Sequence, residues 1–157
     1  YLITNATIHH VDLPHKAITE MYKVASKGIL IVESNDSFFM KLATKLKFAE
    51  DFEISSIDTE KKTGGLLDTG IPNYVYRWTE REISKLIMSY DPSHVNHITF
   101  TYSNDLNNYS FDKKNILKKI FFNICFLMTK VFFLIFKKQQ NCLGIFIDKT
   151  KIKKRFI

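Results

Sequence analysis

Two adjacent histidines near the start of the chain, His9 and His10, are the residues best suited to chemistry. Imidazole titrates near neutral pH, so one of these rings could take a proton from a substrate hydroxyl group. The alternative is a structural pair held by hydrogen bonds. Adjacent side chains on a strand point to opposite sides, so both rings would not bind one metal ion well. We therefore expect His10 or His9 to be catalytic, and we expect no metal site.

A second set of residues suits substrate binding. Glu33 follows a run of apolar residues and could hydrogen-bond a substrate, although it could equally cap the next helix. Tyr74, Arg77 and Trp78 follow a long polar stretch. Aromatic rings and a guanidinium group bind ring-bearing or anionic molecules by stacking and by bidentate hydrogen bonds. We expect these four residues to contact the substrate; the alternative for the last three is that they anchor the polar stretch by packing.

The histidines lie between two predicted strands that a helix connects. Leu2 and Ile3 are apolar and predict the first strand. This strand ends at a segment of small and polar residues, Asn5-Ala6-Thr7. The run from Ile29 to Val32 is apolar on both faces, as in a central parallel strand. Between them, apolar residues recur at helical spacing at Ala17, Ile18, Met21, Val24 and Ala25. A right-handed crossover through this helix makes the two strands parallel.

The ends of this helix carry suitable residues. Asp12 is a possible N-cap, and Pro14 fits the first turn, where its missing N–H costs little. Lys27 and Gly28 combine a cation with a residue that tolerates positive φ, which favours a helix end.

Residues 1–34 resemble the second half of the core of class I S-adenosylmethionine-dependent methyltransferases, in the small-molecule branch called methyltransferase 11. After its fourth strand, this branch has a small polar residue, a His-His pair, an acidic-Pro turn, a helix ending in R-V-L-K-P-G-G, and a fifth strand. The matching segments are Asn5-Ala6-Thr7, His9-His10, Asp12-Leu13-Pro14, Tyr22 to Gly28, and Ile29 to Glu33. Lys23 stands where arginine is usual, and one glycine of the usual pair is missing.

The resemblance implies an α/β fold with a doubly wound, Rossmann-like methyltransferase sheet, and S-adenosyl-L-methionine as the cofactor. Asn5, Ala6 and Thr7 would line the methionine and methyl end of that cofactor. In the family, the first strand lies beside the fourth, and the sixth and seventh strands pair antiparallel at one edge. The acidic residue and glycine-rich turn that hold the cofactor in the family do not occur in these 157 residues. We therefore expect a partial sheet that lacks its first strands and has an antiparallel last strand.

The rest of the chain predicts further elements of one partial domain spanning residues 1–157. Thr79 and Glu82 have the spacing of a capping box, which gives a firm start to the next helix. Asp36 is a possible cap for a shorter helix. The expected parts are the strand–helix–strand core (1–34), a short helix (37–48), a candidate lid (49–78), a helix (80–90), a half-buried strand (97–102), a last strand (142–148) and a basic tail (149–157), with residues 79–148 forming the C-terminal helices and strand pair.

Residues 115–138 form the most apolar segment and predict a long helix. Lys118, Lys119, Asn123 and Lys130 interrupt it, so it is a poor membrane span. At 1.5 Å per residue it would run ~34 Å and exceed the strands, so it should break in two or overhang the sheet. We expect it to pack on the sheet; the alternative is contact with a membrane surface.

The net charge of +7 is concentrated late in the sequence. We expect the basic tail to be a solvated end; the alternatives are attraction to an acidic membrane surface or to an anionic substrate. No basic strand interleaved with aromatic residues accompanies it, so we expect no nucleic-acid partner. Cys125 and Cys142 are isolated, as in a cytoplasmic protein with reduced thiols.

The leading prediction is methyl transfer from S-adenosyl-L-methionine to a small-molecule acceptor, anionic acceptors included, with this chain as the C-terminal part of the enzyme. On its own, the chain is expected to be inactive and to self-associate through the exposed edge of its first strand. The rival prediction is a non-catalytic fragment or partner-binding module. A third is a protein associated with the membrane surface through residues 115–138 and the basic tail.

Overall fold

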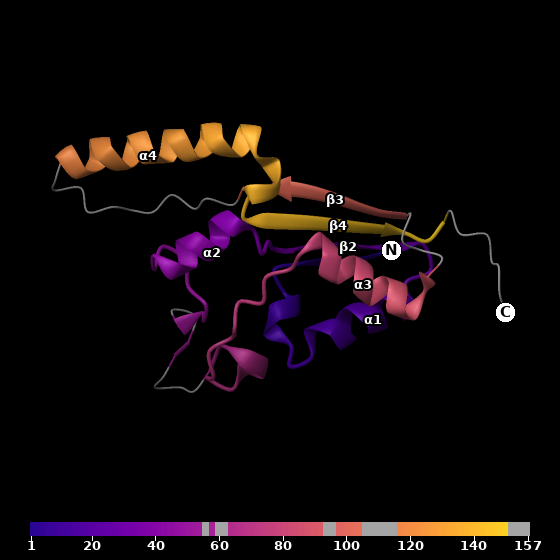
Figure 1. The fold of residues 1–157 in the computed structure, drawn as a ribbon. Helices are drawn as coiled ribbons and strands as arrows, with labels where there is room; N and C mark the ends of the chain where they lie inside the picture. Colours follow the sequence, from indigo (N-terminus) through magenta and orange to yellow (C-terminus); the bar gives the residue numbers. More distant parts are fainter. Residues whose placement is uncertain (55–56, 59–62, 93–96, 105–115, 151–157) are drawn as a thin grey trace.

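A computed structural model describes residues 1–54, 57–58, 63–92, 97–104 and 116–150 of the chain. Within these residues the protein has a mixed α/β fold, built on a four-stranded open sheet with the strand order β1-β2-β4-β3 (Figure 1). The strands are β1 (Leu2–Asn5), β2 (Gly28–Ser34), β3 (Ile98–Ser103) and β4 (Cys142–Asp148). The longer helices are α1 (Pro14–Val24), α2 (Phe38–Lys45), α3 (Glu80–Tyr90) and α4 (Ile116–Ile135).

The predicted strand–helix–strand core is confirmed. β1 pairs in parallel with β2, with Leu2 opposite Ile29 and Asn5 opposite Val32. Pro14 is the first residue of α1, but the N-cap is Leu13 and makes no side-chain cap, so the prediction that Asp12 caps the helix is wrong. The helix ends at Val24, with Ala25 as an extended C-cap, and not at the predicted Lys27-Gly28 pair.

The predicted antiparallel strand pair is also confirmed. β4 pairs antiparallel with β2 on one side and with β3 on the other, so β3 forms one edge of the sheet and β1 the other. The alternation expected for residues 97–102 appears in β3 as half-buried and exposed residues in turn. The sheet is therefore parallel in one pair and antiparallel in the other two.

The core lies on one face of the sheet, which α1 and α3 cover (Figure 1). Ile29 and Ile31 of β2 have no exposed surface, whereas Leu30 and Val32 on the opposite face are only half-buried. The prediction that β2 is buried on both faces is therefore wrong. The fully buried residues that meet on the covered face are Ile18, Ile29, Ile31, Trp78, Ile83, Leu143, Ile145 and Ile147.

Two helix caps differ in how well the sequence predicted them. Thr79 caps α3 as expected, since its side chain accepts a hydrogen bond from the Glu82 amide. The cap of α2 is Ser37, whose hydroxyl group accepts from the Met40 amide, and not the predicted Asp36. Between these helices the described part of residues 49–78 holds the 3-10 turn η3 (Leu66–Asp68) and isolated β-bridges, such as that between Phe52 and Tyr74.

The prediction that the long apolar helix packs on the sheet is wrong. α4 is one unbroken helix that runs beyond the end of the sheet (Figure 1). Of the two expected alternatives, a break or an overhang, the structure shows the overhang. Phe133 near its C-terminal end is fully buried, but most of its large apolar side chains are exposed. These exposed side chains are Ile120, Ile124, Phe126, Leu127, Met128, Val131, Leu134 and Ile135. No helix in the described ranges combines the length and hydropathy needed to cross a bilayer.

The close pairing of β2 with β4 generates a stability prediction. A Cβ atom added at Gly28 would lie 2.5 Å from the Ile147 carbonyl oxygen, which belongs to the backbone of the neighbouring strand. A Cβ atom at Gly144 would lie 2.4 Å from the hydroxyl oxygen of Thr101, an exposed side chain that can rotate away. We expect Gly28→Ala to lower the free energy of unfolding by about 1–3 kcal/mol and Gly144→Ala by under about 1 kcal/mol.

Urea unfolding of both variants, followed by circular dichroism, measures this difference. A larger loss for Gly144→Ala than for Gly28→Ala would contradict the register of β2 against β4.

Candidate functional site

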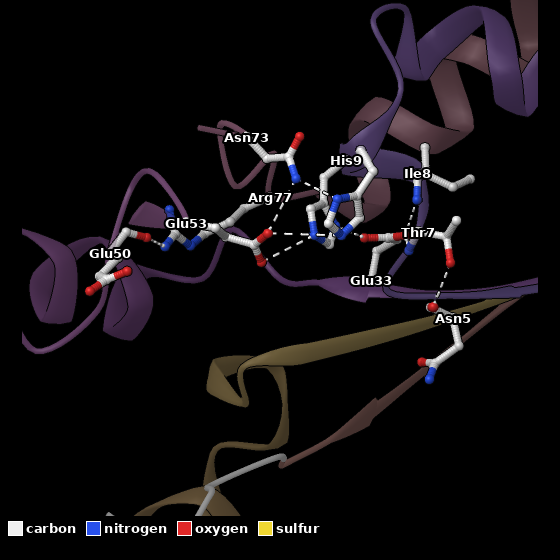
Figure 2. A network of polar contacts seen from close by, with 10 residues as sticks. Asn5, Thr7, Ile8, His9, Glu33, Glu50, Glu53, Asn73 and Arg77 are labelled. Carbon is white, nitrogen blue, oxygen red and sulfur yellow. Dashed lines mark hydrogen bonds and ion pairs between the residues drawn. The ribbon is translucent and has the colours of Figure 1, made fainter. Parts of the chain in front are cut away.

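A buried carboxylate joins the ends of the two parallel strands. Glu33, near the end of β2, is 2 % exposed. Its Oε1 atom accepts hydrogen bonds from the backbone amides of Thr7 at 2.8 Å and Ile8 at 2.7 Å, just beyond the end of β1 (Figure 2). Parallel pairing brings the carboxyl ends of β1 and β2 to the same edge, so the side chain reaches the segment that leaves its neighbour. Glu33 is therefore placed as a positioning residue for that segment.

The second oxygen of the same carboxylate orients His9. Glu33 Oε2 lies 2.8 Å from His9 Nδ1, and both side chains are almost completely buried. With Nδ1 donating to the carboxylate, the Nε2 atom of a neutral His9 carries the lone pair. The hydrogen bond to Glu33 raises the pKa of His9, against the opposing effect of burial, and the nearby Glu53 carboxylate raises it further.

The two histidine rings lie side by side. They belong to a 3-10 turn, η1 (Ile8–His10), and not to a strand, so the argument that adjacent histidines must point apart does not hold here. The ring centroids of His9 and His10 are 4.4 Å apart, with an angle of 35° between the ring planes. His9 is buried, whereas 40 % of the His10 side chain is exposed and accessible to solvent.

Two residues from the candidate lid complete the cluster, and sequence reasoning missed both. Glu53 places Oε1 3.3 Å from His9 Nε2 and Oε2 3.8 Å from His10 Nε2. The contact with His9 lacks the alignment of a hydrogen bond, so the buried Nε2 atom has no hydrogen-bond partner in the part of the chain that the structure describes. Asn73 is fully buried, and its amide nitrogen contacts His10 Nδ1 and lies 3.4 Å from Glu53 Oε2 (Figure 2).

The loop holds these two residues together through its backbone. The Glu53 amide donates to the Asn73 carbonyl group at 3.0 Å, and a short bridge pairs Phe52 with Tyr74. No local motif marks either residue, since they are twenty positions apart in an irregular segment. Their shared polarity was the only available signal in the sequence.

A small pocket lies at the carboxyl ends of β1 and β2, and neither His9 nor His10 lines it. Its volume is about 210 Å³, and it brings together four predicted site residues: Asn5, Ala6, Glu33 and Arg77. Ala6 has a φ of 47°, a left-handed conformation that is uncommon for alanine and is found at ligand-binding turns. Its amide donates to the Val32 carbonyl group at 2.8 Å, which fixes the turn against β2.

The other predicted site residues are more scattered. Thr7 donates its hydroxyl proton to the Asn5 carbonyl group and does not line the pocket. Trp78 has no exposed surface and packs in the core, and half-exposed Tyr74 packs against Phe52. The structure therefore places these two aromatic rings as packing residues of the lid.

Arg77 both anchors the lid and lines the pocket. Its guanidinium group donates to Asp51 Oδ1 at 3.1 Å and to the Glu50 carbonyl oxygen at 2.6 Å. The buried Nε atom of Arg77 has no hydrogen-bond partner within the described residues. The contacts with Asp51 and Glu50 therefore leave one donor of the guanidinium group unused.

The cluster can perform two kinds of chemistry. The partly exposed His10 ring can accept a proton from a molecule in solution. The side chains of His9, His10 and Glu53 each offer one ligand atom for a metal ion, and these atoms all lie within 4.8 Å of one another. The sequence-based expectation of no metal site rested on the strand geometry that the turn η1 replaces.

The contact between His9 and Glu33 generates a pH prediction. Because the folded-state pKa of His9 lies above the ordinary value of 6.5, its protonation stabilises the folded protein below that pH. This contribution disappears as the pH rises through the folded-state pKa. Removal of the negative charge in Glu33→Gln should return the pKa of His9 toward its ordinary value.

NMR titration of the imidazole protons, with a chelator present, measures this shift. Glu82→Gln is the matched control, because Glu82 contacts a different histidine, His15, at 3.0 Å. A His9 pKa at or below 6.5 in the unaltered chain, or the same pKa in Glu33→Gln, would contradict the assigned contact.

Comparison of the chain with protein-family models, with curated proteins and with solved structures gives no match. The functional inference therefore depends on the geometry of the site and on the resemblance of residues 1–34.

Proposed function

We propose that this chain forms the C-terminal part of an enzyme that transfers a methyl group from S-adenosyl-L-methionine to a small-molecule acceptor. The observation that carries the proposal is the pocket at the carboxyl ends of the parallel strands β1 and β2, which is lined by Glu33, the same residue that orients His9. Ligands of open α/β sheets bind at this edge. The segments that form it are the ones on which the resemblance to the methyltransferase family rests.

The arrangement of the sheet supports the same proposal. The family pattern places an antiparallel pair at one sheet edge after the fifth strand, and β3 and β4 occupy such a position next to β2. At the other edge, β1 pairs only with β2 among the described strands, so its outer edge can pair with a further strand. The proposal includes a doubly wound sheet in the complete enzyme, with helices packed on both faces.

The residues of the pocket fit the methionine end of the cofactor. Ala6 has a side chain of one methyl group, which lets a ligand approach the backbone, and Asn5 offers an amide group to a carboxylate or an ammonium group. A volume of about 210 Å³ suits this end of the molecule and not the whole of it. When bound, the cofactor supplies a methyl group on an already activated sulfonium.

His10 and Arg77 would then act on the acceptor. His10 Nε2 is placed to take the proton that a hydroxyl or amine acceptor loses as it is methylated. Arg77 Nε can donate to an anionic group on the acceptor. Glu33 and Asn73 hold the histidine turn and the lid in place, so that alignment of the reactants contributes most of the rate.

An NMR titration with S-adenosylhomocysteine tests the cofactor site in this chain. We expect amide shifts at Asn5, Ala6 and Glu33, with weak affinity, because the glycine-rich turn that holds the rest of the cofactor in the family does not occur in this sequence. Asn5→Ala should weaken binding by roughly 2–10-fold, the value of one hydrogen bond. Asn123→Ala, an exposed substitution in α4, is the control and should bind equally well.

Shifts confined to other parts of the chain would contradict the cofactor site. So would an absence of shifts at millimolar ligand, or equal effects of Asn5→Ala and Asn123→Ala.

A second function, attachment to an anionic membrane surface, is favoured by α4. Its large apolar side chains are exposed, and residues 116–147 contain five lysines and no aspartate or glutamate. Apolar side chains with surrounding positive charge are typical of helices that lie in the bilayer interface. In this proposal α4 lies along the membrane surface and does not cross the bilayer.

Vesicle sedimentation tests this second function. We expect the chain to bind vesicles that contain phosphatidylglycerol, and to bind less as salt is raised, because salt screens the lysine charges. Leu134→Glu should reduce binding, whereas Phe38→Glu in α2 should not, although the two residues are equally exposed at 73 % and 74 %. Equal binding to neutral phosphatidylcholine vesicles, or equal loss in both variants, would contradict the proposal.

A further inference from the structure

Three potential metal ligands converge beside the exit from β1. His9, His10 and Glu53 each offer one ligand atom, and these atoms lie within 4.8 Å of one another. We propose that these three side chains bind a divalent transition-metal ion, Zn²⁺ or a close relative. This inference goes beyond methyl transfer and does not depend on it, since neither Asn5 nor Ala6 takes part.

His9 is held in the form that a metal requires. Glu33 accepts the Nδ1 proton at 2.8 Å, so the lone pair of the neutral ring lies on Nε2. That atom is buried and has no hydrogen-bond partner among the described residues, although it faces the Glu53 carboxylate at 3.3 Å. A buried nitrogen without a hydrogen-bond partner costs free energy unless a ligand occupies it. A carboxylate behind a metal-binding histidine is the usual outer-shell arrangement.

His10 reaches the same form through Asn73. The Asn73 amide nitrogen faces His10 Nδ1, while its buried amide oxygen has no hydrogen-bond partner within the described ranges. Rotation of the amide group by 180° would place the oxygen on Nδ1, where it accepts the ring proton. The lone pair of His10 then lies on Nε2, toward Glu53. This rotation gives the amide oxygen a partner and prepares the second ligand, and it gives up the 3.4 Å contact between the amide nitrogen and Glu53 Oε2.

The spacing of the ligand atoms suits a small cation. In a tetrahedral zinc site the ligand atoms lie about 3.3 Å apart, given metal–ligand distances of about 2.0–2.2 Å. His9 Nε2 and Glu53 Oε1 already have a separation of 3.3 Å, and His10 Nε2 is 3.8 Å from Glu53 Oε2. His10 and Glu53 are both partly exposed, so modest side-chain movement closes the remaining gap.

The ligand types define the class of metal. Two imidazoles and one carboxylate favour Zn²⁺, Co²⁺ or Fe²⁺ over Ca²⁺ and Mg²⁺, which prefer all-oxygen sites. Three protein ligands leave a fourth position open to water or to a molecule from solution, as in catalytic sites and unlike structural ones. The exposed side of His10 is the direction from which that molecule would approach.

Titration of the full chain with Co²⁺ alone tests this site, because bound Co²⁺ gives visible ligand-field absorption. We expect one equivalent to bind and to broaden or shift the ring protons of His9 and His10. His10→Ala and Glu53→Gln should each weaken binding by roughly tenfold or more, and Glu33→Gln by roughly 10–100-fold, since outer-shell partners contribute on this scale. His15→Ala is the matched control, because His15 also contacts a glutamate, Glu82, but lies outside the cluster.

Thermal unfolding of each variant separates loss of a ligand from loss of the fold. His10 and Glu53 are partly exposed, so we expect His10→Ala and Glu53→Gln to stay folded. A folded variant with unchanged Co²⁺ affinity would overturn the site. Equal losses in His15→Ala and His10→Ala would also overturn it. So would a near-ultraviolet charge-transfer band, because that band indicates thiolate ligands and would place the metal at a cysteine.

Discussion

The carboxylate of Glu33 is the constraint on which the candidate site depends. It extends from the end of β2, accepts two backbone amides at the exit from β1, and orients the ring of His9. Without it, the buried amide of Ile8, the partly buried amide of Thr7 and one imidazole nitrogen would lose their partner, at a cost of about 1–3 kcal/mol for each buried group. The turn η1 keeps its conformation, and the two histidine rings remain side by side, because this one side chain satisfies all three donors.

The lid adds the groups that make the turn chemically useful. Glu53 and Asn73 meet the histidines from the opposite side, and Arg77 ties the same segment to Asp51. Both proposals use this arrangement and share the Nε2 atom of His10, which acts as a base in one and as a metal ligand in the other. Methyl transfer needs the pocket beside Ala6 and an imidazole open to solvent, whereas metal binding needs two imidazole lone pairs directed toward Glu53.

Much of the fold was predictable because local signals coincide with the tertiary structure. Apolar periodicity identified α1 and α3, and the alternation in residues 97–102 identified β3. The cap of α2 could not be predicted, since Asp36 and Ser37 are adjacent and both are good capping residues. The position of α4 could not be predicted either. Its apolar residues indicate a buried helix, and nothing local shows that the sheet leaves them uncovered.

In the site, the histidines and Glu33 were visible as polar residues next to strands. Their meeting with Glu53 and Asn73 depends on the path of an irregular loop, which no periodicity encodes.

Hydrogen exchange at two backbone amides tests most directly the claim that Glu33 builds the site. The amides of Thr7 and Ile8 lie outside the sheet ladder, yet they should exchange slowly because both donate to a buried carboxylate. Glu33→Ala should abolish this protection while the amides that pair β2 with β4 remain protected, as Ile31 and Ile145 would show. Fast exchange of Thr7 and Ile8 in the unaltered chain, or protection that survives in Glu33→Ala, would contradict the account.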